Sequence, residues 1–418
     1  VRYDGSLKAS VILKDLAPFV PALSRFEEPL DLNLVFSGHG KHLDCPTLQL
    51  ANHHGLMIAG EAALSNWDAG MDMYIYGKLG NLIMTKEGIN VLMTNLTGKV
   101  PPILQRLDYI RFNGEAAGYL HDLTLTGLFY TGAGMVKTDV MMSIDEQSMS
   151  RTYSGSVASA DLDLGKLLNQ EKKFGKVDFN VELKGFNYKN RYPESYIKGI
   201  ISSFEYSQYQ YENIMLDGVY KDGGFNGRLS MDDANGSVQI DGNFNVAKTI
   251  PDFNLKASVK NLRPHDLHLS DKYENTSISL GLTADFTGKS IDDMNGRISL
   301  DSLQLNAPDE RGCFLDNLTI TAGQVSGEKE LRINSSFMTA VIRGDYSYHT
   351  IPASVVKTVQ RYIPSLLTIK DNMPEPHNNF QFDICLENTE VLSKLFQIPL
   401  ELYLSLIHIS EPTRPERI

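Results

Sequence analysis

One short segment gathers residue types that bind metals. His39, His42 and Cys45 follow one another at three-residue spacing, and His53 and His54 come soon after. A closed zinc site needs four ligands that converge on one point. These residues straddle a turn and two strand edges, so we do not expect them to converge. The sequence therefore predicts no metal site here.

Two acidic pairs and one histidine pair also have spacings that could serve chemistry. Residues 232–233 and 292–293 are Asp-Asp pairs, which could act as acid/base pairs or calcium ligands. Each pair precedes a turn with Asn-Gly, where Asp is favoured because it hydrogen-bonds to its own backbone. His265 and His268 lie in a loop-like segment where polar residues alternate with leucines, which favours solvated histidines.

A run of tyrosines is the last candidate for chemistry. Tyr206, Tyr209, Tyr211 and Tyr220 could form a stacking platform for a sugar or a base. Tyrosine is also an ordinary residue of β-strands, and we favour that interpretation. Nucleophile-elbow, Walker, dinucleotide and zinc-protease motifs are absent from the sequence. The sequence predicts a protein that is not an enzyme and that uses no cofactor.

The dominant pattern is strict alternation of apolar and polar residues, which indicates strands with one apolar face and one wet face. Residues Ile278–Phe286 alternate over their whole length, and Val177–Leu183 do the same. Turn dipeptides such as Asn235-Gly236 and Asn295-Gly296 divide these segments. Counted along the chain, the pattern implies about 20–25 strands.

Such a sheet cannot stay flat and open, because sheets of more than about ten strands curl or split. We therefore expect a mostly β fold, a long antiparallel meander curled into a half-pipe, taco-like or β-solenoid-like groove, or else a set of sandwiches. The groove is expected to run continuously over residues 1–403. A few short helices would cap or plug parts of the sheet, near residues 16–24, 102–107, 162–170, 352–367 and 389–396.

The composition excludes several classes of function. The 418 residues carry 39 basic and 51 acidic side chains, a net charge of −12, which argues against nucleic-acid binding. No apolar run is long enough to cross a bilayer. The three cysteines are far apart and lack a CxxC spacing, so no disulfide framework is indicated.

Both ends of the sequence are unusual. The chain starts with Val1 inside an amphipathic pattern, from which we expect a fragment of a longer protein. Residues 404–418 begin with LSLIHISEPTR, which looks like a translated sequencing adapter, and we expect this segment not to be native. The alternative interpretation is a genuine apolar strand with a proline-containing tail.

Four segments resemble the C-terminal region of TamB-type translocation and assembly proteins, which belong to the AsmA-like superfamily. Within that superfamily the segments are most similar to the Bacteroidetes branch. The segments are Gly165–Gly185, Asn213–Asn245, Gly281–Leu305 and Gly344–Leu366. The resemblance covers most of residues 1–403. It rests on similar residue patterns and short similar stretches of sequence, since the superfamily has no catalytic motif.

The resemblance implies a protein of the cell envelope that contributes to outer-membrane biogenesis. Such proteins are anchored in the inner membrane by an N-terminal helix, here outside the sequence, and reach across the periplasm. Their partner is an outer-membrane barrel protein of the BamA/TamA type. The superfamily is thought to carry phospholipid between the two membranes along an apolar groove, and TamB was first associated with outer-membrane protein and adhesin assembly.

The residue pattern and the resemblance lead to one hypothesis, an apolar β-groove that conducts phospholipid. Acyl chains would need no specific residue there. The alternative is a scaffold that assembles outer-membrane β-barrel proteins by β-augmentation. A β-solenoid adhesin or glycan-binding module would need a regular short repeat and aromatic ladders, and neither is clear. The candidate groove-lining residues are Val177, Phe179, Val181, Leu183, Leu229, Val238, Ile240, Phe244, Phe253, Leu255, Val259, Ile278, Leu280, Leu282 and Phe286.

Overall fold

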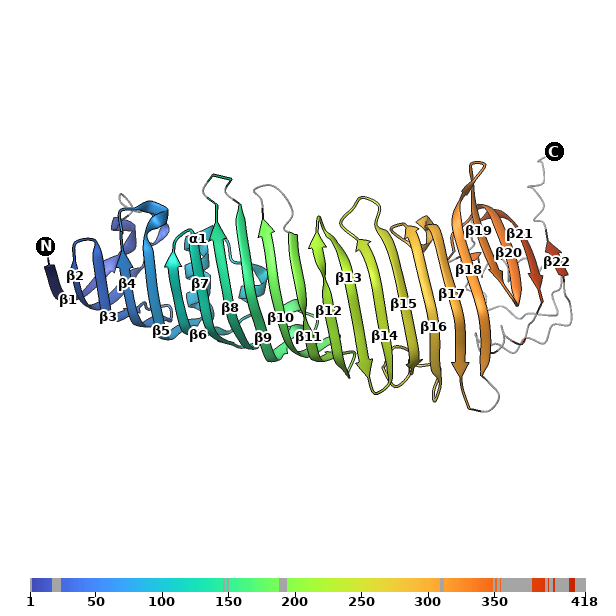
Figure 1. The fold of residues 1–418 in the computed structure, drawn as a ribbon, viewed down its shortest axis with the longest axis horizontal. Coiled ribbons are helices and arrows are strands. Elements are labelled where there is room, and N and C mark those ends of the chain that lie inside the picture. Colours follow the sequence, from blue (N-terminus) through green and yellow to red (C-terminus); the bar gives the residue numbers. More distant parts are fainter. Residues whose placement is uncertain are drawn as a thin grey trace, which may run out of the picture. The chain divides into compact units, whose positions relative to one another are not determined.

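The computed structural model describes residues 2–16, 24–145, 147–148, 150–187, 194–308, 312–348, 350–351, 354, 378–387, 390 and 394, and the backbone of residues 406–409. The chain divides into two units, Val1–Asp222 (Unit 1) and Gly223–Ile418 (Unit 2). Each unit is built mainly of antiparallel strands that follow one another in chain order (Figure 1). The expected mostly β meander is confirmed, and the described strands do not close into a barrel.

Unit 1 contains the strands β1 to β12, and each pair of consecutive strands from β1 to β12 is antiparallel and hydrogen-bonded. Tight turns join many neighbours. Ser207 and Gln208, between β11 and β12, have φ of 51° and 66°, the left-handed pair that a two-residue hairpin turn requires. The strands are β1 (Arg2–Ile12), β2 (Pro29–His39), β3 (His42–Ala51), β4 (Leu56–Ser65), β5 (Tyr74–Thr85), β6 (Tyr109–Tyr119), β7 (Asp122–Thr131), β8 (Gly134–Ile144), β9 (Arg151–Asp163), β10 (Phe174–Asn187), β11 (Glu194–Tyr206) and β12 (Tyr209–Lys221).

Unit 2 continues the same pattern from β13 to β22, again with pairing between chain neighbours only. The last four strands are shorter than most of those before them. The strands are β13 (Gly224–Asp233), β14 (Gly236–Asn245), β15 (Asp252–Leu262), β16 (Ser277–Thr287), β17 (Asn295–Asn306), β18 (Cys313–Val325), β19 (Glu328–Ser335), β20 (Met338–Asp345), β21 (Asn379–Leu386) and β22 (Leu406–Ile409).

The register decides which side chains share a face, because directly paired residues of antiparallel strands point to the same side of the sheet. In Unit 1, Leu34 of β2 pairs with Leu7 of β1 and with Leu48 of β3. In Unit 2, Leu282 of β16 pairs with Ala257 of β15 and Leu300 of β17. Followed strand by strand, the pairing collects most of the apolar residues of each unit on one side, which we call its apolar face. The opposite side is the polar face.

Bulges keep the apolar face continuous where the alternation is interrupted. Asn213 in β12 and Ser302 in β17 have φ of 52° and 51°, in the left-handed region. At the second of these, β16 advances two residues from Ser279 to Gly281 while β17 advances three from Asp301 to Gln304, so β17 carries one extra residue between Leu300 and Leu303. The extra residue of the bulge makes the step between inward side chains three positions instead of two, so the second side chain returns to the same face.

Three α-helices lie in the described part of the chain, α1 (Lys86–Thr97), α2 (Pro102–Gln105) and α3 (Leu164–Leu168), with short 3-10 helices η1 (Leu13–Leu16), η3 (Gly70–Asp72) and η4 (Ile291–Asp293). Thr85 caps α1, because its Oγ1 accepts a hydrogen bond from the N–H of Gly88 at 3.2 Å. Ile89 of α1 is 1% exposed and packs in a cluster with Leu107 and Ile110. The helices therefore cover the apolar face at one end of β5–β7.

The expected helices compare unevenly with these elements. The helix α2 lies within the expected range 102–107, and α3 lies within 162–170. The helix α1 was not expected from the sequence. The ranges 16–24, 352–367 and 389–396 lie almost wholly outside the described residues. Of residues 404–418 only the backbone of β22 is described, and this strand pairs with β21. Such a pairing does not test whether the segment is native, and the adapter interpretation stays a prediction. Continuity of one groove over residues 1–403 also stays a prediction.

Candidate functional site: the apolar faces

The four candidate residues of Unit 1 lie together on its apolar face. Val177, Phe179, Val181 and Leu183 follow one another along β10 and pair with β11 residues of the same face. Val181 pairs with Val157 of β9, which extends the set to the other neighbour. This arrangement brings the inward residues of β10 into line with those of the strands on either side.

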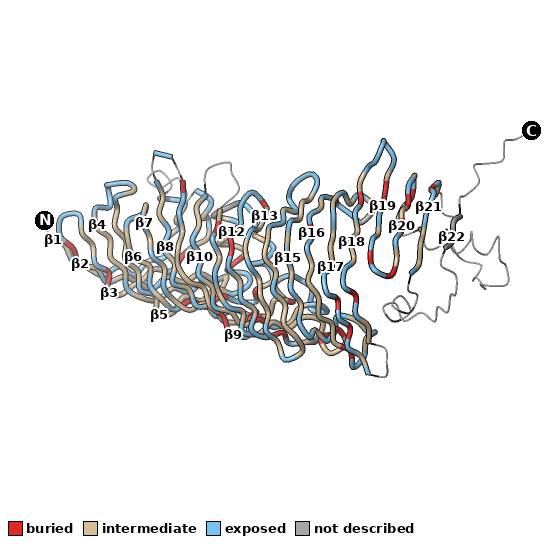
Figure 2. Tube along the Cα trace, turned by 45° about the vertical axis from the view of Figure 1, so that its right-hand side comes forward, coloured by how far each residue is buried: buried red, intermediate tan, exposed pale blue. Residues whose placement is uncertain are grey.

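Exposure differs systematically between the two faces of a strand. On β10, Phe179, Val181 and Leu183 are half-buried, whereas Glu182 and Lys184 between and after them are exposed. The same alternation of intermediate and exposed residues can be followed along the strands in Figure 2. Over most of these strands no described segment covers the apolar face. Bending of the sheet toward this side would crowd its side chains and lower their exposure in this way.

Glycines under aromatic rings allow this bending. Gly114 of β6 and Gly127 of β7 pair directly, and the ring of Phe112 lies over both. A Cβ added at Gly127 would lie 2.5 Å from that ring, which is too close for any larger residue. The ring of Tyr153 covers Gly185 in the same way. A glycine in a strand lets another group approach the backbone closely, and the ring restores apolar cover there.

The remaining candidates lie together on the apolar face of Unit 2. Four phenylalanines stand in line across β13–β16, since Phe244 pairs with both Phe225 and Phe253, and Phe253 pairs with Phe286. The rings of Phe253 and Phe286 stack with centroids 4.8 Å apart. Phe244 is 40% exposed. The other candidates on this face, all half-buried, are Leu229, Val238, Ile240, Leu255, Val259, Ile278, Leu280 and Leu282.

The polar faces are solvated and carry cross-strand ion pairs. Lys198 Nζ lies 3.5 Å from Asp217 Oδ2 across β11 and β12, and Arg228 Nε lies 2.5 Å from Asp241 Oδ1 across β13 and β14. Exposed pairs of this kind contribute at most about 1 kcal/mol. Charged side chains of both signs therefore lie on the solvated polar faces.

Two hollows also lie on the polar face of Unit 1. One, of about 680 Å³, is lined by residues of β1–β4 that include Lys8, Asn33 and Gln49. The other, of about 600 Å³, is lined by residues of β8–β12 that include Lys184 and Tyr196. Both are open to solvent and mix charged, amide and apolar groups. Neither gathers the convergent groups that a catalytic site requires.

The histidine and cysteine segment does not form a metal site. His42 and Cys45 are three positions apart on β3, so they point to opposite faces, and Cys45 is buried. The ring of His42 instead contacts Ser65 Oγ at 2.7 Å and Asp44 Oδ2 at 2.9 Å. Among the described residues no group of His, Cys, Asp and Glu could hold a metal ion.

His54 has a different role, at the start of α1. Its Nδ1 lies 2.7 Å from Glu87 Oε1 and its Nε2 lies 3.2 Å from Glu28 Oε2. The hydrogen bond with Glu87, and then that with Glu28, raises the pKa of His54 above its ordinary value. The histidine therefore joins the β3–β4 turn to the helix that covers part of the apolar face.

The local sequence explains the contacts of some of the acidic-pair and tyrosine residues but not of all of them. Asp233 serves its turn, since its Oδ1 accepts from the N–H of Asn235 at 2.8 Å. Asp292 does not act locally, because its carboxylate binds a segment more than fifty residues away, at Ser347 and Tyr348. Tyr209 and Tyr211 pack edge to face with centroids 4.8 Å apart, near Phe204 and Tyr206, while Tyr220 lies at the other end of β12.

No helix in the described ranges combines the length and apolar character that crossing a membrane requires. Comparison of the chain with protein-family models, curated proteins and solved structures found no match.

Proposed function

We propose that this chain binds phospholipid through the acyl chains, on the apolar faces of its two units. One observation carries the proposal: the register places apolar residues of successive strands on one face in each unit, and much of that face stays half-exposed. Soluble proteins rarely leave a contiguous apolar surface of more than a few hundred Å² without a partner. An acyl chain would remove that surface from water.

The chemistry of the apolar faces favours a ligand without polar groups. Along β10 and β16 the inward side chains are aliphatic or aromatic. Burying an acyl chain against them is favourable by about 0.8 kcal/mol for each methylene group. A headgroup would remain in water at the rim, where the charged residues of the polar faces begin.

We further propose that the chain belongs to a bridge-like envelope protein that carries phospholipid between the inner and outer membranes of a bacterium. The support is the resemblance to TamB-type proteins in the segments Gly165–Gly185 and Gly281–Leu305. On this proposal the protein is not an enzyme. It is held in the inner membrane outside the given sequence, works in the periplasm, and meets an outer-membrane barrel protein of the BamA/TamA type.

The test is photo-crosslinking from matched positions on the two faces. A photo-reactive residue replaces Phe179 or Leu282 on the apolar faces, and Asn180 or Thr283 on the polar faces serves as the control. After incubation with phospholipid vesicles and irradiation, we expect lipid adducts at the first pair and background at the second. Lipid extracted from the purified chain is identified by mass spectrometry in parallel.

Equal labelling at Leu282 and Thr283 would contradict acyl binding on the apolar face. Crosslinks to an unfolded barrel protein from strand backbones, with no phospholipid in the extract, would favour the β-augmentation scaffold instead. That second outcome is read from a parallel irradiation in which an unfolded barrel protein replaces the vesicles and the photo-reactive residue lies on an edge strand.

A further inference from the structure

The apolar face of Unit 2 changes character along the sheet. One residue from each strand, directly paired with the next, forms a single row across β13–β21. The first four members are the phenylalanines described above. After Gly296 the row passes beneath other side chains, and every later member is buried. The complete row is Phe225, Phe244, Phe253, Phe286, Gly296, Ala322, Leu331, Ile342 and Phe382.

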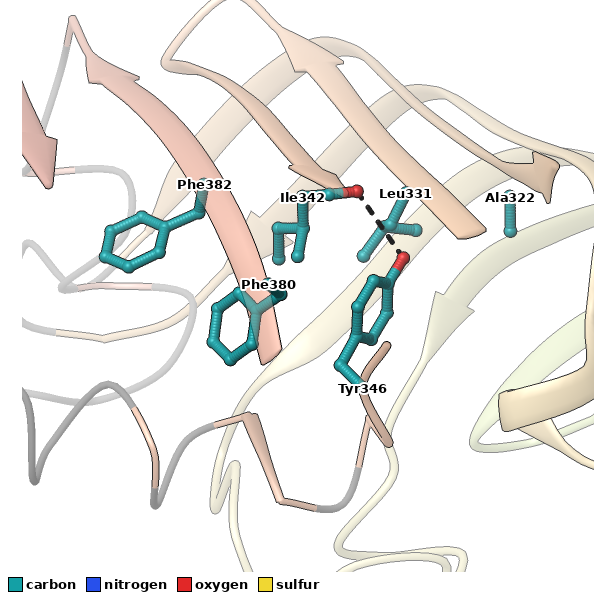
Figure 3. Close-up of a cluster of buried hydrophobic side chains, with 6 residues drawn as sticks. All are labelled: Ala322, Leu331, Ile342, Tyr346, Phe380 and Phe382. Carbon is teal, nitrogen blue, oxygen red and sulfur yellow. Dashed lines mark hydrogen bonds between the residues drawn. The ribbon is translucent and has the colours of Figure 1, made fainter. Parts of the chain in front are cut away.

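Tyr346 covers the buried part of this row (Figure 3). It follows β20, is 5% exposed, and packs against Ala322, Leu331 and Ile342. Its ring centroid lies 5.9 Å from that of Phe380, and its hydroxyl lies 3.5 Å from the carbonyl oxygen of Ile342. Burial raises the pKa of the Tyr346 phenol. An aromatic side chain of the protein thus occupies the place that an acyl chain would take.

Two charged residues hold Tyr346 and its neighbours in that place. The carboxylate of Asp292, on η4, accepts hydrogen bonds from Ser347 Oγ at 2.8 Å and from the N–H of Tyr348 at 2.5 Å. Lys329 Nζ donates to the carbonyl oxygen of Tyr346 at 3.0 Å and lies 4.6 Å from the centroid of its ring. The segment is therefore attached to β19 and to the β16–β17 connection as well as to its own strand.

The amide of Asn378 adds a third attachment. It donates to Thr350 Oγ1 at 2.9 Å and to Ser354 Oγ at 2.7 Å. Asn378 stands immediately before β21, so the residues after Tyr346 are joined to the strand that ends the row. A segment attached at three points does not move aside at low cost.

Phe337 covers the other end of the same strands. It lies in the connection between β19 and β20, is 3% exposed, and packs with Leu303 and Leu315. Ser335 Oγ fixes this connection by accepting from the N–H of Met338 at 3.0 Å. The strands between the two aromatic residues have 8 residues each, against 13 in β18. Because Tyr346 and Phe337 cover these short strands from their two ends, little of the apolar face of β19 and β20 remains uncovered.

We propose that Tyr346 and Phe337 form an end wall of the apolar face of Unit 2, so that acyl chains bind over β13–β16 and do not extend onto β19–β21. The inference that acyl chains are the ligand rests on the proposed function, whereas the wall itself does not. The surface beneath the wall is already out of water, so an acyl chain gains nothing there unless it displaces Tyr346. Because the chain on either side of this ring is held by Asp292 and Lys329, moving the segment that carries it would leave those hydrogen bonds unmade.

The first test maps bound lipid on the full chain. Phosphatidylcholine vesicles with a diazirine on the acyl chain are irradiated with the protein, and labelled residues are located by mass spectrometry. We expect label on Ile240 and Leu282 and background on Leu331 and Ile342. The variant Asp292→Ala should bring label onto Leu331 and Ile342.

The neighbouring variant Asp293→Ala is the matched control, because its carboxylate accepts only locally, from Ser290 Oγ at 3.1 Å. It should label as the unchanged chain does. Equal label on Leu282 and Leu331 before any substitution, or an unchanged pattern in Asp292→Ala, would overturn the wall. Absence of label from Leu282 would instead contradict the proposed function, and the second test then decides on the wall.

The second test needs no lipid. In a chain whose three cysteines are replaced by alanine, Ala322→Cys lies under the wall and Ala257→Cys lies on the open part of the same face. Both are reacted with an apolar maleimide. We expect Ala322→Cys to react about tenfold more slowly, and the difference to disappear when Tyr346→Ala or Asp292→Ala is added. Equal rates without those additions would refute the wall.

Discussion

A charge placed in the middle of the apolar face gives the sharpest test of acyl binding. Leu282 lies between Ala257 and Leu300 in the register of β15–β17 and is half-buried. In Leu282→Asp the carboxylate keeps its hydration and holds an acyl chain away from the strand. Strands lie about 4.8 Å apart, a distance that an extended acyl chain spans with about four methylene groups, and about four groups therefore lose their contact. At about 0.8 kcal/mol each, the loss is about 3.2 kcal/mol, or about 200-fold in Kd.

The assay is equilibrium binding of a fluorescent phospholipid analogue to the purified chain. Thr283→Asp is the matched control, because it adds the same charge one residue away on the exposed polar face and should leave Kd unchanged. Circular dichroism and a thermal melt of both variants verify that the fold is intact. A folded Leu282→Asp chain that binds as tightly as the unchanged chain, or an equal loss in Thr283→Asp, would refute the reasoning.

Further predictions concern stability, each measured by urea unfolding of the full chain. Gly114→Ala should destabilise the chain by about 1–3 kcal/mol, because its Cβ would lie 2.3 Å from a backbone oxygen. Gly77→Ala is the control and should be neutral, because a Cβ there has nothing within 4 Å. Equal losses of stability in the two variants would contradict the role given to the glycines. Thr85→Ala should cost about 1 kcal/mol by uncapping α1, and no change would argue against the cap. The pKa of His54 is raised, chiefly by its hydrogen bond with Glu87. The stability that this histidine contributes is therefore complete below pH about 6.5 and is lost as pH rises through the folded-state pKa. His54→Gln should destabilise the chain at pH 5.5 and not at pH 8.5, and a loss of stability at both pH values would refute this.

Regular alternation was enough to predict most of the sheet. Residues Ile278–Phe286 alternate without a break, and they lie within β16 (Ser277–Thr287). The candidate residues were all taken from such unbroken segments, and the pairing places them on the apolar faces. Alternation fails at bulges, where Leu303 follows Leu300 by three positions yet returns to the same face. A period of two cannot identify such residues, because the extra residue is visible only in the pairing.

Two other features depend on partners that are distant in the sequence. The helix α1 contains Gly88 and several Asn and Thr residues, which are poor helix formers, and its sequence alone gives little signal. It is stabilised by packing of Ile89 against Leu107 and Ile110. Asp292 precedes a turn and was interpreted as a turn residue. Its contact with Ser347 joins segments 55 residues apart, which no local pattern contains.

Because every described strand pairs only with its neighbours in the chain, each unit can form by local steps. Adding a strand requires closure of a short loop at most steps, so the loss of chain entropy there is small and folding can spread from a hairpin. The same arrangement governs how the protein can change in length. Deleting one strand would reverse the direction of all that follow, whereas deleting two consecutive strands leaves their flanking strands antiparallel and free to pair. Units of this kind should therefore lengthen or shorten by whole hairpins.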